Sequence, residues 1–388
     1  MERMNQRQAQ TLQHKLPQRQ AQTLQCKLPQ RQAQTLQRKL PQRQSQPLRR
    51  KLPLRRARTA LLPLLLTLLL ALMPAALASI EFKTVEEIEP FFRMDRDSQA
   101  AWKGEVANLR LLTEGKYRFG KASGKYGIDP DFTPSTRGLD TLDISGSAQF
   151  SEGQFHALAQ VLRKCAKGKA IYVIDLRSES HAFLNGHPIS WYAIHNRANA
   201  GMSRREVAAD EKARFGALVG TTVKAYGMSH DDRTDSIEID VRSWQTERKL
   251  VKGEGFGYLR IPVLDYSWPT PGQVDAFIDF VKGIDMENTW LHFHCHAGTG
   301  RTGIFMMLYD MMKNPGVPLE DILVRHTLTG SEYPLYVGNP ESFHGALRQE
   351  KAEMMPLLYQ YVQENHKKHY RLSWSRWLKR RERAAGDD

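Results

Sequence analysis

The residues best suited to chemistry lie in one short stretch, which reads Leu291-His-Phe-His-Cys-His-Ala-Gly-Thr-Gly-Arg-Thr-Gly303. Trp290–Cys295 is predicted to be a strand and Arg301–Met312 a helix, with a loop of small residues between them. Such a loop lets successive backbone N–H groups turn inward around an anion, and the helix N-terminus adds the positive end of its dipole. Arg301 can bridge two phosphate oxygens. Cys295, at the base of this anion site, should have a lowered pKa and is a nucleophile suited to phosphoryl transfer.

A phosphocysteine mechanism also needs an acid that protonates the leaving oxygen. The candidate is Asp265, in Arg260-Ile-Pro-Val-Leu-Asp-Tyr-Ser-Trp-Pro-Thr270. It follows a predicted buried strand and precedes a Trp-Pro turn and a helix. An aspartate at such a position is normally a turn or cap residue. Its position upstream of the cysteine strand resembles the acid loop of the protein-tyrosine-phosphatase superfamily, which makes Asp265 the candidate acid.

The elements that must position these groups alternate between strand and helix. Buried strands are expected at Ala170–Leu176, Gly257–Val263 and Trp290–Cys295. Helices are expected at 151–165 and 203–218, each opened by a capping box, and at 270–281, 301–312, 318–327 and 341–364. This alternation predicts an α/β fold. Two half-exposed antiparallel strands, Thr221–Tyr226 and Ser236–Arg242, interrupt it and predict a small β subdomain at about 221–256.

The pattern from His294 to Thr302, His-Cys-x-x-x-x-x-Arg-Thr, is the signature of the protein-tyrosine-phosphatase superfamily. A wider set of segments resembles the bacterial PTP-like (cysteine) phytases, which are myo-inositol polyphosphate phosphatases of that superfamily. These segments are Ile144–Ser151, Asp175–His181 with Leu184–Gly186, Ile261–Thr270, Trp290–Cys295, Lys313–Pro315, Tyr361–Asn365 and Trp374–Leu378. The resemblance covers roughly residues 90–378. It implies a tyrosine-phosphatase-like core sheet flanked by helices, with a small partial β-barrel subdomain.

The resemblance also implies a reaction, the stepwise dephosphorylation of myo-inositol hexakisphosphate without a metal or other cofactor. Cys295 would be the nucleophile and Arg301 the phosphate clamp, while Asp265 would act first as acid and then as base. Thr302 would steady the thiolate as it leaves, and His294 belongs to the same signature. The loop amides would bind the phosphoryl oxygens (His296, Ala297, Gly298, Thr299 and Gly300).

More peripheral roles follow from the same resemblance. Further substrate contacts are expected from Arg93, His195, Tyr266, Arg348 and Lys351, while Asp175 and Arg177 would support the pocket. Three positions depart from the common family pattern, because His296, Tyr266 and Gly303 stand where Glu, His and Thr are frequent. These departures remove no catalytic group, but they leave the substrate preference and the order of phosphate removal open.

Two other site types share this stretch of sequence. Gly298–Gly303 matches the dinucleotide fingerprint G-x-G-x-x-G, but the acids about 20 residues on, Glu320 and Asp321, lie in a helical pattern instead of ending a strand. His292, His294 and His296 alternate as on one strand face and could bind zinc, but no carboxylate ligand is nearby in the sequence. We therefore expect no metal and interpret His292 as a core histidine.

Two other functions remain as alternatives to the phytase. One is a protein-tyrosine or phosphoinositide phosphatase, which would use the same nucleophile, clamp and acid. The other is a phosphate-binding pseudoenzyme, which the presence of all three groups disfavours. A highly anionic substrate needs basic side chains around Cys295, and the sequence does not reveal whether they converge there.

The charge of the chain is concentrated at its N-terminal end. The whole formal charge of +14 belongs to residues 1–78, whereas residues 79–388 contain equal numbers of basic and acidic residues. The predicted catalytic domain, 79–388, is therefore neutral, and a nucleic-acid-binding function loses its support. Residues 6–53 are four copies of a 12-residue Gln-rich unit without an apolar face, and we expect residues 1–53 to be disordered.

Residues 54–78 are predicted to be a signal peptide. Basic residues from Arg55 precede a leucine-rich run, and Ala76-Leu-Ala78 forms a small-x-small cleavage site. We expect cleavage after Ala78, a secreted or periplasmic protein and no stable membrane anchor after cleavage. Because a signal peptide normally opens a chain, we hypothesise that translation starts near Leu48–Leu54 and that the repeat is upstream DNA read in frame.

Overall fold

The computed structural model describes residues 89–95, 106–112, 121–229 and 232–386. The predicted repeats, the signal peptide and the cleavage site at Ala78 lie outside the described residues. Among the helices that are described, none is long and apolar enough to cross a membrane.

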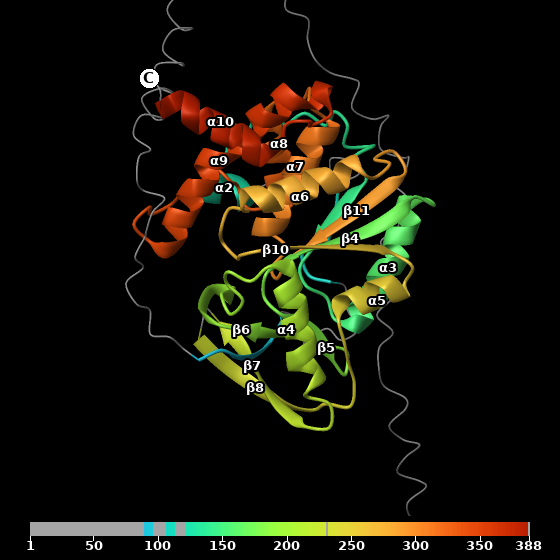
Figure 1. Ribbon diagram of the computed structural model, residues 1–388. Coiled ribbons are helices and arrows are strands. Elements are labelled where there is room, and N and C mark those ends of the chain that lie inside the picture. Colours follow the sequence, from blue (N-terminus) through green and yellow to red (C-terminus); the bar gives the residue numbers. More distant parts are fainter. Residues whose placement is uncertain (1–88, 96–105, 113–120, 230–231, 387–388) are drawn as a thin grey trace, which may run out of the picture. The chain divides into compact units, whose positions relative to one another are not determined.

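The core is a five-stranded sheet with the order β10-β4-β11-β3-β2 (Figure 1). Its strands are β10 Gly257–Val263, β4 Ala170–Arg177, β11 Thr289–His294, β3 Ile144–Ser147 and β2 Arg110–Leu111. The first four run parallel, and only β2 is antiparallel to its neighbour. Parallel strands are covered on both faces, which explains why β4, β10 and β11 are mostly apolar in sequence. The α/β prediction and all three predicted buried strands are confirmed.

Helices cover the two faces of this sheet (Figure 1). One face packs against α6 Pro271–Lys282, α7 Gly300–Lys313, α8 Leu319–Leu328, α9 Phe343–Asn365 and α10 Trp374–Gly386, while α3 Glu152–Ala166 and α5 Glu247–Gly253 lie on the other. A short helix, α2, spans Lys121–Tyr126. The predicted capping boxes are present at α3 and at α4 Arg204–Gly216, where Ser151 and Ser203 each accept a hydrogen bond from the third residue of the helix. Thr270 forms a further capping box at α6, which also has the predicted proline at its first position.

A second, six-stranded sheet has the order β8-β7-β1-β6-β5-β9. It comprises β1 Phe91–Met94, β5 His181–Leu184, β6 His187–Tyr192, β7 Thr222–Ser229, β8 Asp232–Asp240 and β9 Trp244–Gln245. Helix α4, Arg204–Gly216, packs Phe215 against its apolar face beside Met94 and Ile189. The paired strands β7 and β8 confirm the predicted antiparallel strands.

The predicted β subdomain at 221–256 is too narrow. Three of the six strands come from other parts of the chain, and α5 within 221–256 packs on the core sheet through Leu250 and Val251. The missed hairpin β5–β6 turns at Asn185 and Gly186, both with positive φ, which is the turn that an Asn-Gly pair favours. Among the described strands, β8 and β9 form the two edges, so this sheet is open and a partial barrel is not evident.

The topology places the chemical groups at one end of the core sheet. Strands β4, β10 and β11 run parallel and end at Arg177, Val263 and His294. Residues that follow these strands therefore meet at the same edge, which is where α/β proteins bind ligands. Cys295 and Asp265 both follow strands that end there.

Candidate active site

The nucleophile candidate, Cys295, is 2% exposed and directly follows β11. The loop His296–Thr299, which we call the cysteine loop, leads into α7. The backbone N–H of Gly298 donates to the Cys295 Sγ at 3.3 Å. Among the described residues, no side chain caps the N-terminus of α7 at Thr299. The first N–H groups of this helix are therefore left for another acceptor.

The carbonyl groups of the cysteine loop are bound from outside. The His296 carbonyl accepts from the Gln149 N–H at 3.1 Å, and the Ala297 carbonyl accepts from Asn108 Nδ2 at 2.8 Å. The Gly298 carbonyl accepts from an Arg110 guanidinium nitrogen at 2.5 Å. A peptide unit that points its carbonyl outward presents its N–H group to the inside, so these bonds preorganise an anion-binding bowl above the thiol.

Gly298 is the one position in the loop where glycine is required. Its φ is +73°, and a Cβ atom there would lie 2.3 Å from the Ser147 carbonyl oxygen at the end of β3. A side chain would push the loop away from the sheet edge that holds it.

Burial lowers the pKa of the Arg110 guanidinium, which binds the Gly298 carbonyl, to about 10, and the charge at Cys295 acts in the opposite direction.

Arg301, in the first turn of α7, is held rigidly by a buried carboxylate. Its two terminal nitrogens donate to the two oxygens of Glu179 at 2.8 and 3.1 Å, and one also donates to the Val263 carbonyl at 3.1 Å. Burial alone would raise the pKa of the Glu179 carboxyl, but Arg301 and Arg177 hold it well below its usual range. The Arg301 Nε is buried and has no hydrogen-bond partner among the described residues. One edge of the guanidinium is therefore fixed, and a donor on the other edge is available to an anion.

The acid candidate, Asp265, lies next to that available edge. Its Oδ1 is 3.1 Å from the Arg301 Nε, and its side chain is 17% exposed. The Asp265 Oδ2 accepts from Asn196 Nδ2 at 2.6 Å, and Oδ1 accepts from the Tyr266 N–H at 3.0 Å. The Asp265 Oδ1 thus lies beside the Arg301 Nε, at the place where an oxygen of a bound phosphate would lie.

Seven side chains form a closed ring of polar contacts around this point. From Asp265 the ring passes to Asn196, whose Oδ1 accepts from Arg93 at 2.7 Å. Arg93 donates to Asp95 at 3.0 Å, and Asp95 accepts from Arg177 at 2.8 Å. Arg177 Nε donates to Glu179 at 2.9 Å, and Glu179 binds Arg301, which returns to Asp265. The ring joins Arg93 of the second sheet to Arg177 at the end of β4 and to Arg301 in the first turn of α7.

The three alternating histidines lie in separate environments. His292 is bonded by Ser145 at 2.9 Å and Ser147 at 3.1 Å, and burial lowers its pKa to about 3, so it is a neutral core residue. His294 Nε2 bonds the Glu247 carboxylate at 2.6 Å. His296 Nε2 is 3.6 Å from Asp95, and burial holds its pKa well below the usual range. The three rings do not share a ligand position, and the acids Glu320 and Asp321 open α8, as the pattern indicated.

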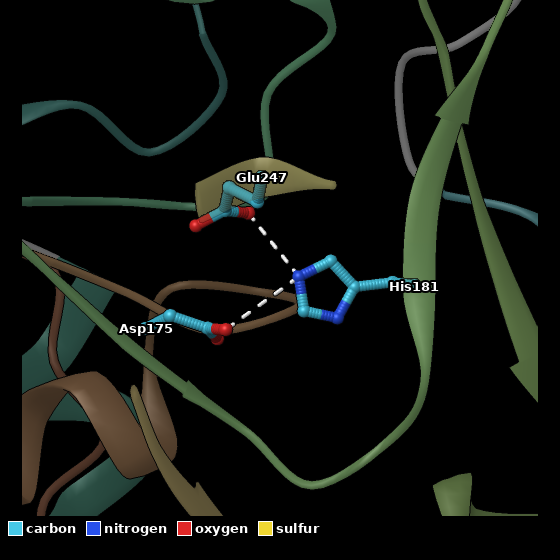
Figure 2. Close-up of side chains that lie close together, drawn as sticks. All are labelled: Asp175, His181 and Glu247. Carbon is cyan, nitrogen blue, oxygen red and sulfur yellow. Dashed lines mark hydrogen bonds and ion pairs between the residues drawn. The ribbon is translucent and has the colours of Figure 1, made fainter. Parts of the chain in front are cut away.

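A buried trio, Asp175, His181 and Glu247, has donor atoms close enough to hold a metal ion (Figure 2). His181 Nε2 lies 3.2 Å from Glu247 and 3.6 Å from Asp175. Burial lowers the pKa of His181, but the two carboxylates outweigh it and raise that pKa. Arg260 Nε also lies 3.2 Å from Asp175. His181 lies between both carboxylates, and the Arg260 guanidinium shares one of them, Asp175. This arrangement is typical of an ion-pair cluster, which is how we interpret the trio.

Aromatic rings gather beside Asp265. His195, with a φ of +57°, stacks on Phe343 at 4.0 Å between ring centroids. Tyr266 is 36% exposed and packs edge-on against His344 at 4.6 Å. The Arg197 guanidinium lies 5.2 Å from the Phe343 ring. These four rings (His195, Tyr266, Phe343 and His344), which we call the aromatic rim, join the loop that carries Asp265, the acid loop, to the start of α9.

The two predicted basic contacts of α9 meet on one carboxylate. Arg348 Nε and Lys351 Nζ lie 3.1 and 3.2 Å from the two oxygens of Glu332. The Glu332 N–H donates to the Thr299 carbonyl at 3.2 Å, so this residue is adjacent to the cysteine loop. Burial raises the pKa of Glu332, but Lys351 and Arg348 lower it overall.

The structure brings most of the predicted site residues to one place, with differences in detail. Arg93 is buried in the polar ring. The Thr302 hydroxyl is buried and has no hydrogen-bond partner within the described part of the chain. Asp175 accepts the Arg177 N–H and the Tyr258 hydroxyl, whereas the Arg177 guanidinium binds Asp95 and Glu179.

Several residues of the site were not predicted from the sequence: Asp95, Asn108, Arg110, Glu179, Asn196, Glu247 and Glu332. Only Glu179 gave a signal, because it lies in the segment Asp175–His181 that carries the family resemblance. The others are single polar residues in segments without a recognisable pattern.

Comparison with known proteins agrees with this geometry. A family model described as PTP-like phytase, inositol hexakisphosphate, matches residues 174–313, which include Asp265, Cys295 and Arg301. The tandemly repeated protein tyrosine phosphatase like phytase of Mitsuokella multacida is 37% identical with a TM-score of 0.70, over 76% of this chain and 50% of that chain.

Two further relatives cover similar shares. The PTP-like myo-inositol phosphatase of Mitsuokella multacida, solved in complex with myo-inositol-(1,3,4,5)-tetrakisphosphate, is 36% identical with a TM-score of 0.68, over 76% of this chain and 50% of that chain. Effector protein hopD2 of Pseudomonas syringae pv. tomato is 27% identical over 252 residues, 62% of this chain and 52% of that protein. The chain thus spans about half the length of these relatives.

Proposed function

Because this chain belongs to the PTP-like phytase family, we propose that it removes phosphate groups stepwise from myo-inositol hexakisphosphate through a phosphocysteine intermediate. One observation carries the proposal. Cys295 lies at the base of a loop whose carbonyls are bound outward, beside an arginine whose Nε makes no hydrogen bond among the described residues and is paired only with the Asp265 carboxylate at 3.1 Å. This is a preorganised site for a phosphoryl group above a nucleophile.

In the first step, the Cys295 thiolate attacks phosphorus. The sulfur–phosphorus bond forms while the bond from phosphorus to the inositol oxygen breaks. The loop N–H groups and the Arg301 Nε stabilise the charge on the three outer phosphoryl oxygens. Asp265, displaced from Arg301 by the phosphate, gives its proton to the leaving oxygen, so that an alcohol departs instead of an alkoxide.

In the second step, water hydrolyses the phosphocysteine. The Asp265 carboxylate takes a proton from a water molecule whose oxygen attacks phosphorus. The phosphorus–sulfur bond breaks, inorganic phosphate leaves and the thiolate is restored. The orphaned Thr302 hydroxyl, in the first turn of α7, is a donor that can steady this thiolate. Asp265 can then return to Arg301.

The charges around the site favour a substrate with several phosphates. Arg93 and Arg177 belong to the polar ring that holds Arg301 and Asp265, and Arg348 and Lys351 pair with Glu332, whose N–H donates to Thr299 of the cysteine loop. A neighbouring phosphate on the same ring can exchange places with the Glu332 carboxylate on Arg348 and Lys351, because phosphate and carboxylate bind the same donors. The relative solved with inositol tetrakisphosphate supports this substrate class.

A protein-tyrosine or phosphoinositide phosphatase is the alternative. The aromatic rim of His195, Tyr266, Phe343 and His344 favours an aryl phosphate, since rings can pack against the ring of a phosphotyrosine. The rim lies next to the acid, where the organic part of the substrate would leave.

The decisive assay compares phosphate release from inositol hexakisphosphate and from a phosphotyrosine peptide, each with and without a chelator. We expect faster release from inositol hexakisphosphate and no effect of the chelator. Cys295→Ser should bind the substrate and release no phosphate, and Asp265→Asn should retain activity mainly on esters with good leaving groups. Full activity of Cys295→Ser would refute the phosphocysteine mechanism.

We further propose that the protein is exported and cleaved after Ala78. The basic, leucine-rich and small-x-small sequence of residues 54–78 supports export. A relative named as an effector protein is consistent with it. N-terminal sequencing of protein recovered from periplasm and culture medium should yield Ser79 as the first residue, and an intact leader on all recovered protein would contradict the proposal.

A further inference from the structure

A second concentration of positive charge lies where α9 turns into α10. Residues 366–383 contain eight Lys and Arg residues and one acid, Glu382, although residues 79–388 as a whole carry no excess charge. Lys367, Lys368, Arg371 and Arg380 are exposed. Among the residues that the structure describes, none of these four forms an ion pair. Like charges this close together repel one another, so their clustering needs an explanation.

The turn that carries these residues is well defined. The Tyr370 N–H donates to the Asn365 carbonyl at 3.1 Å, and the Tyr361 hydroxyl donates to the Leu372 carbonyl at 2.8 Å. His369 and Tyr370 have φ values of 52° and 51°, which is rare for two successive residues with side chains. The cations are thus displayed by a fixed backbone.

The same turn encloses a cavity of about 410 Å³. Its lining, which we call the basic elbow, consists of Asn365, Lys367, Lys368, His369, Arg371, Leu372 and Arg380. No acidic residue contributes to it. A small concave site with arginine forks and lysine charges fits a compact anion better than an extended chain.

The basic elbow is distinct from the candidate active site. Phe343 and Arg348, beside the acid loop and the cysteine loop, lie at the N-terminal end of α9, and Asn365 is its last residue. A helix of 23 residues is roughly 34 Å long. One substrate molecule cannot occupy both sites.

Two structural roles do not account for the elbow. Cations at a helix C-terminus compensate the dipole, but this effect is confined to the last turn and does not explain Arg371 or Arg380. An amphipathic helix can insert into a membrane surface, but the apolar face of α10 is already used, because Trp374 and Trp377 are buried in the core. Its charged residues remain for electrostatic recognition.

We propose that the basic elbow is a second anion site that binds a compact anion carrying several phosphate groups. The anion is either a free polyphosphorylated molecule or the phosphorylated headgroup of a lipid, since both present the same chemistry. The proposal does not depend on turnover at Cys295, so its test can be separated from the proposed function.

Binding stoichiometry tests the proposal. Cys295→Ser full chain, used to prevent turnover, is titrated with inositol hexakisphosphate at low salt in a calorimeter. We expect two equivalents to bind. Adding Lys368→Gln, Arg371→Gln and Arg380→Gln should weaken one of the two sites roughly tenfold or more, since each exposed ion pair contributes a factor of a few. Raised salt should weaken this site first.

A matched triple variant controls for net charge. Arg204→Gln, Arg205→Gln and Lys212→Gln remove three exposed cations from α4 and should leave two equivalents bound. A parallel flotation assay with vesicles containing phosphatidylinositol bisphosphate, or only phosphatidylserine, identifies a lipid source. Unchanged binding by the elbow variant in both assays, or equal weakening by the two triple variants, would overturn the proposal.

Discussion

Asn196 should position the acid, and its replacement by alanine tests whether the polar ring has a catalytic purpose. The Asn196 amide is buried and bonded on both sides, by Arg93 at 2.7 Å and to Asp265 at 2.6 Å. Because a guanidinium can only donate, it fixes the amide oxygen toward Arg93 and the amide N–H toward Asp265. Asn196→Ala removes the hydrogen bond to the Asp265 Oδ2, whereas the Arg301 contact and the Tyr266 N–H remain on Oδ1.

The expected loss follows from the contact that is removed. A hydrogen bond to a charged group contributes about 1.5–3 kcal/mol. If that free energy holds the acid in place, the rate should fall about 10- to 100-fold, because each 1.4 kcal/mol corresponds to a factor of ten. The loss should appear in kcat for inositol polyphosphates, whose leaving alkoxide needs a proton. It should be small for para-nitrophenyl phosphate, which loses a stable phenolate.

The assay compares kcat for both substrates in the variant and in a matched control. Asn199→Ala is the control, because Asn199 is also buried but bonds Ser180 and not Asp265. It should alter stability without changing the ratio of the two kcat values. An equal loss on both substrates in Asn196→Ala would show that Asn196 is merely structural, and no loss on either would refute the positioning role.

Three further predictions concern the cysteine loop, the Glu332 carboxylate and the buried ion pairs. Gly298→Ala should abolish activity and lower the melting temperature, because its Cβ would meet the Ser147 carbonyl, whereas Gly272→Ala, with open space around it, should change neither. Glu332→Gln should lower KM for inositol hexakisphosphate by a factor of a few, because it releases Arg348 and Lys351 from the carboxylate. The KM for a monophosphate should change little. A raised KM for inositol hexakisphosphate would contradict this. Arginines hold the pKa values of the buried Asp95 and Glu179 below the usual range of about 4. Their contribution to the free energy of unfolding is therefore present above about pH 4 and is lost as the pH falls through the depressed pKa values. Urea unfolding should show a nearly constant contribution from these two carboxylates between pH 7 and 5 and a loss below about pH 4. A steep loss of the free energy of unfolding already between pH 6 and 5 would contradict this.

The core sheet was largely predictable because its signals are local. Strands β4, β10 and β11 are mostly apolar, and the helices α3 before β4 and α6 between β10 and β11 begin with capping residues at Ser151 and Thr270. The second sheet was only partly predicted. Its strand β1 is four residues long, and it pairs with β6 almost a hundred residues away. A short strand has too few residues to show a period, and its partner is chosen by the tertiary fold.

The chemical core of the site was readable for the same reason. Cys295 and Arg301 are separated by a fixed number of residues on a strand, a loop and a helix, so their spacing alone implies an anion site. The assignments of Asp265 as the acid and of His195 and Tyr266 as substrate contacts came from the family resemblance. The resemblance did not reveal that Arg348 and Lys351 both contact Glu332.

The sequence by itself therefore determined the nucleophile, the clamp and three of the five core strands, β4, β10 and β11, since each depends on neighbours in the chain. Only the tertiary structure decided how the acid is held. The ring that runs from Asp265 through Asn196, Arg93 and Asp95 to Glu179 joins the second sheet to the core sheet. Buried charges are stable only when they are paired. The partner of each charge depends on which strand ends and loops the fold brings within about 3 Å of one another. Sequence spacing does not encode that proximity, because most of the paired residues lie in distant segments of the chain.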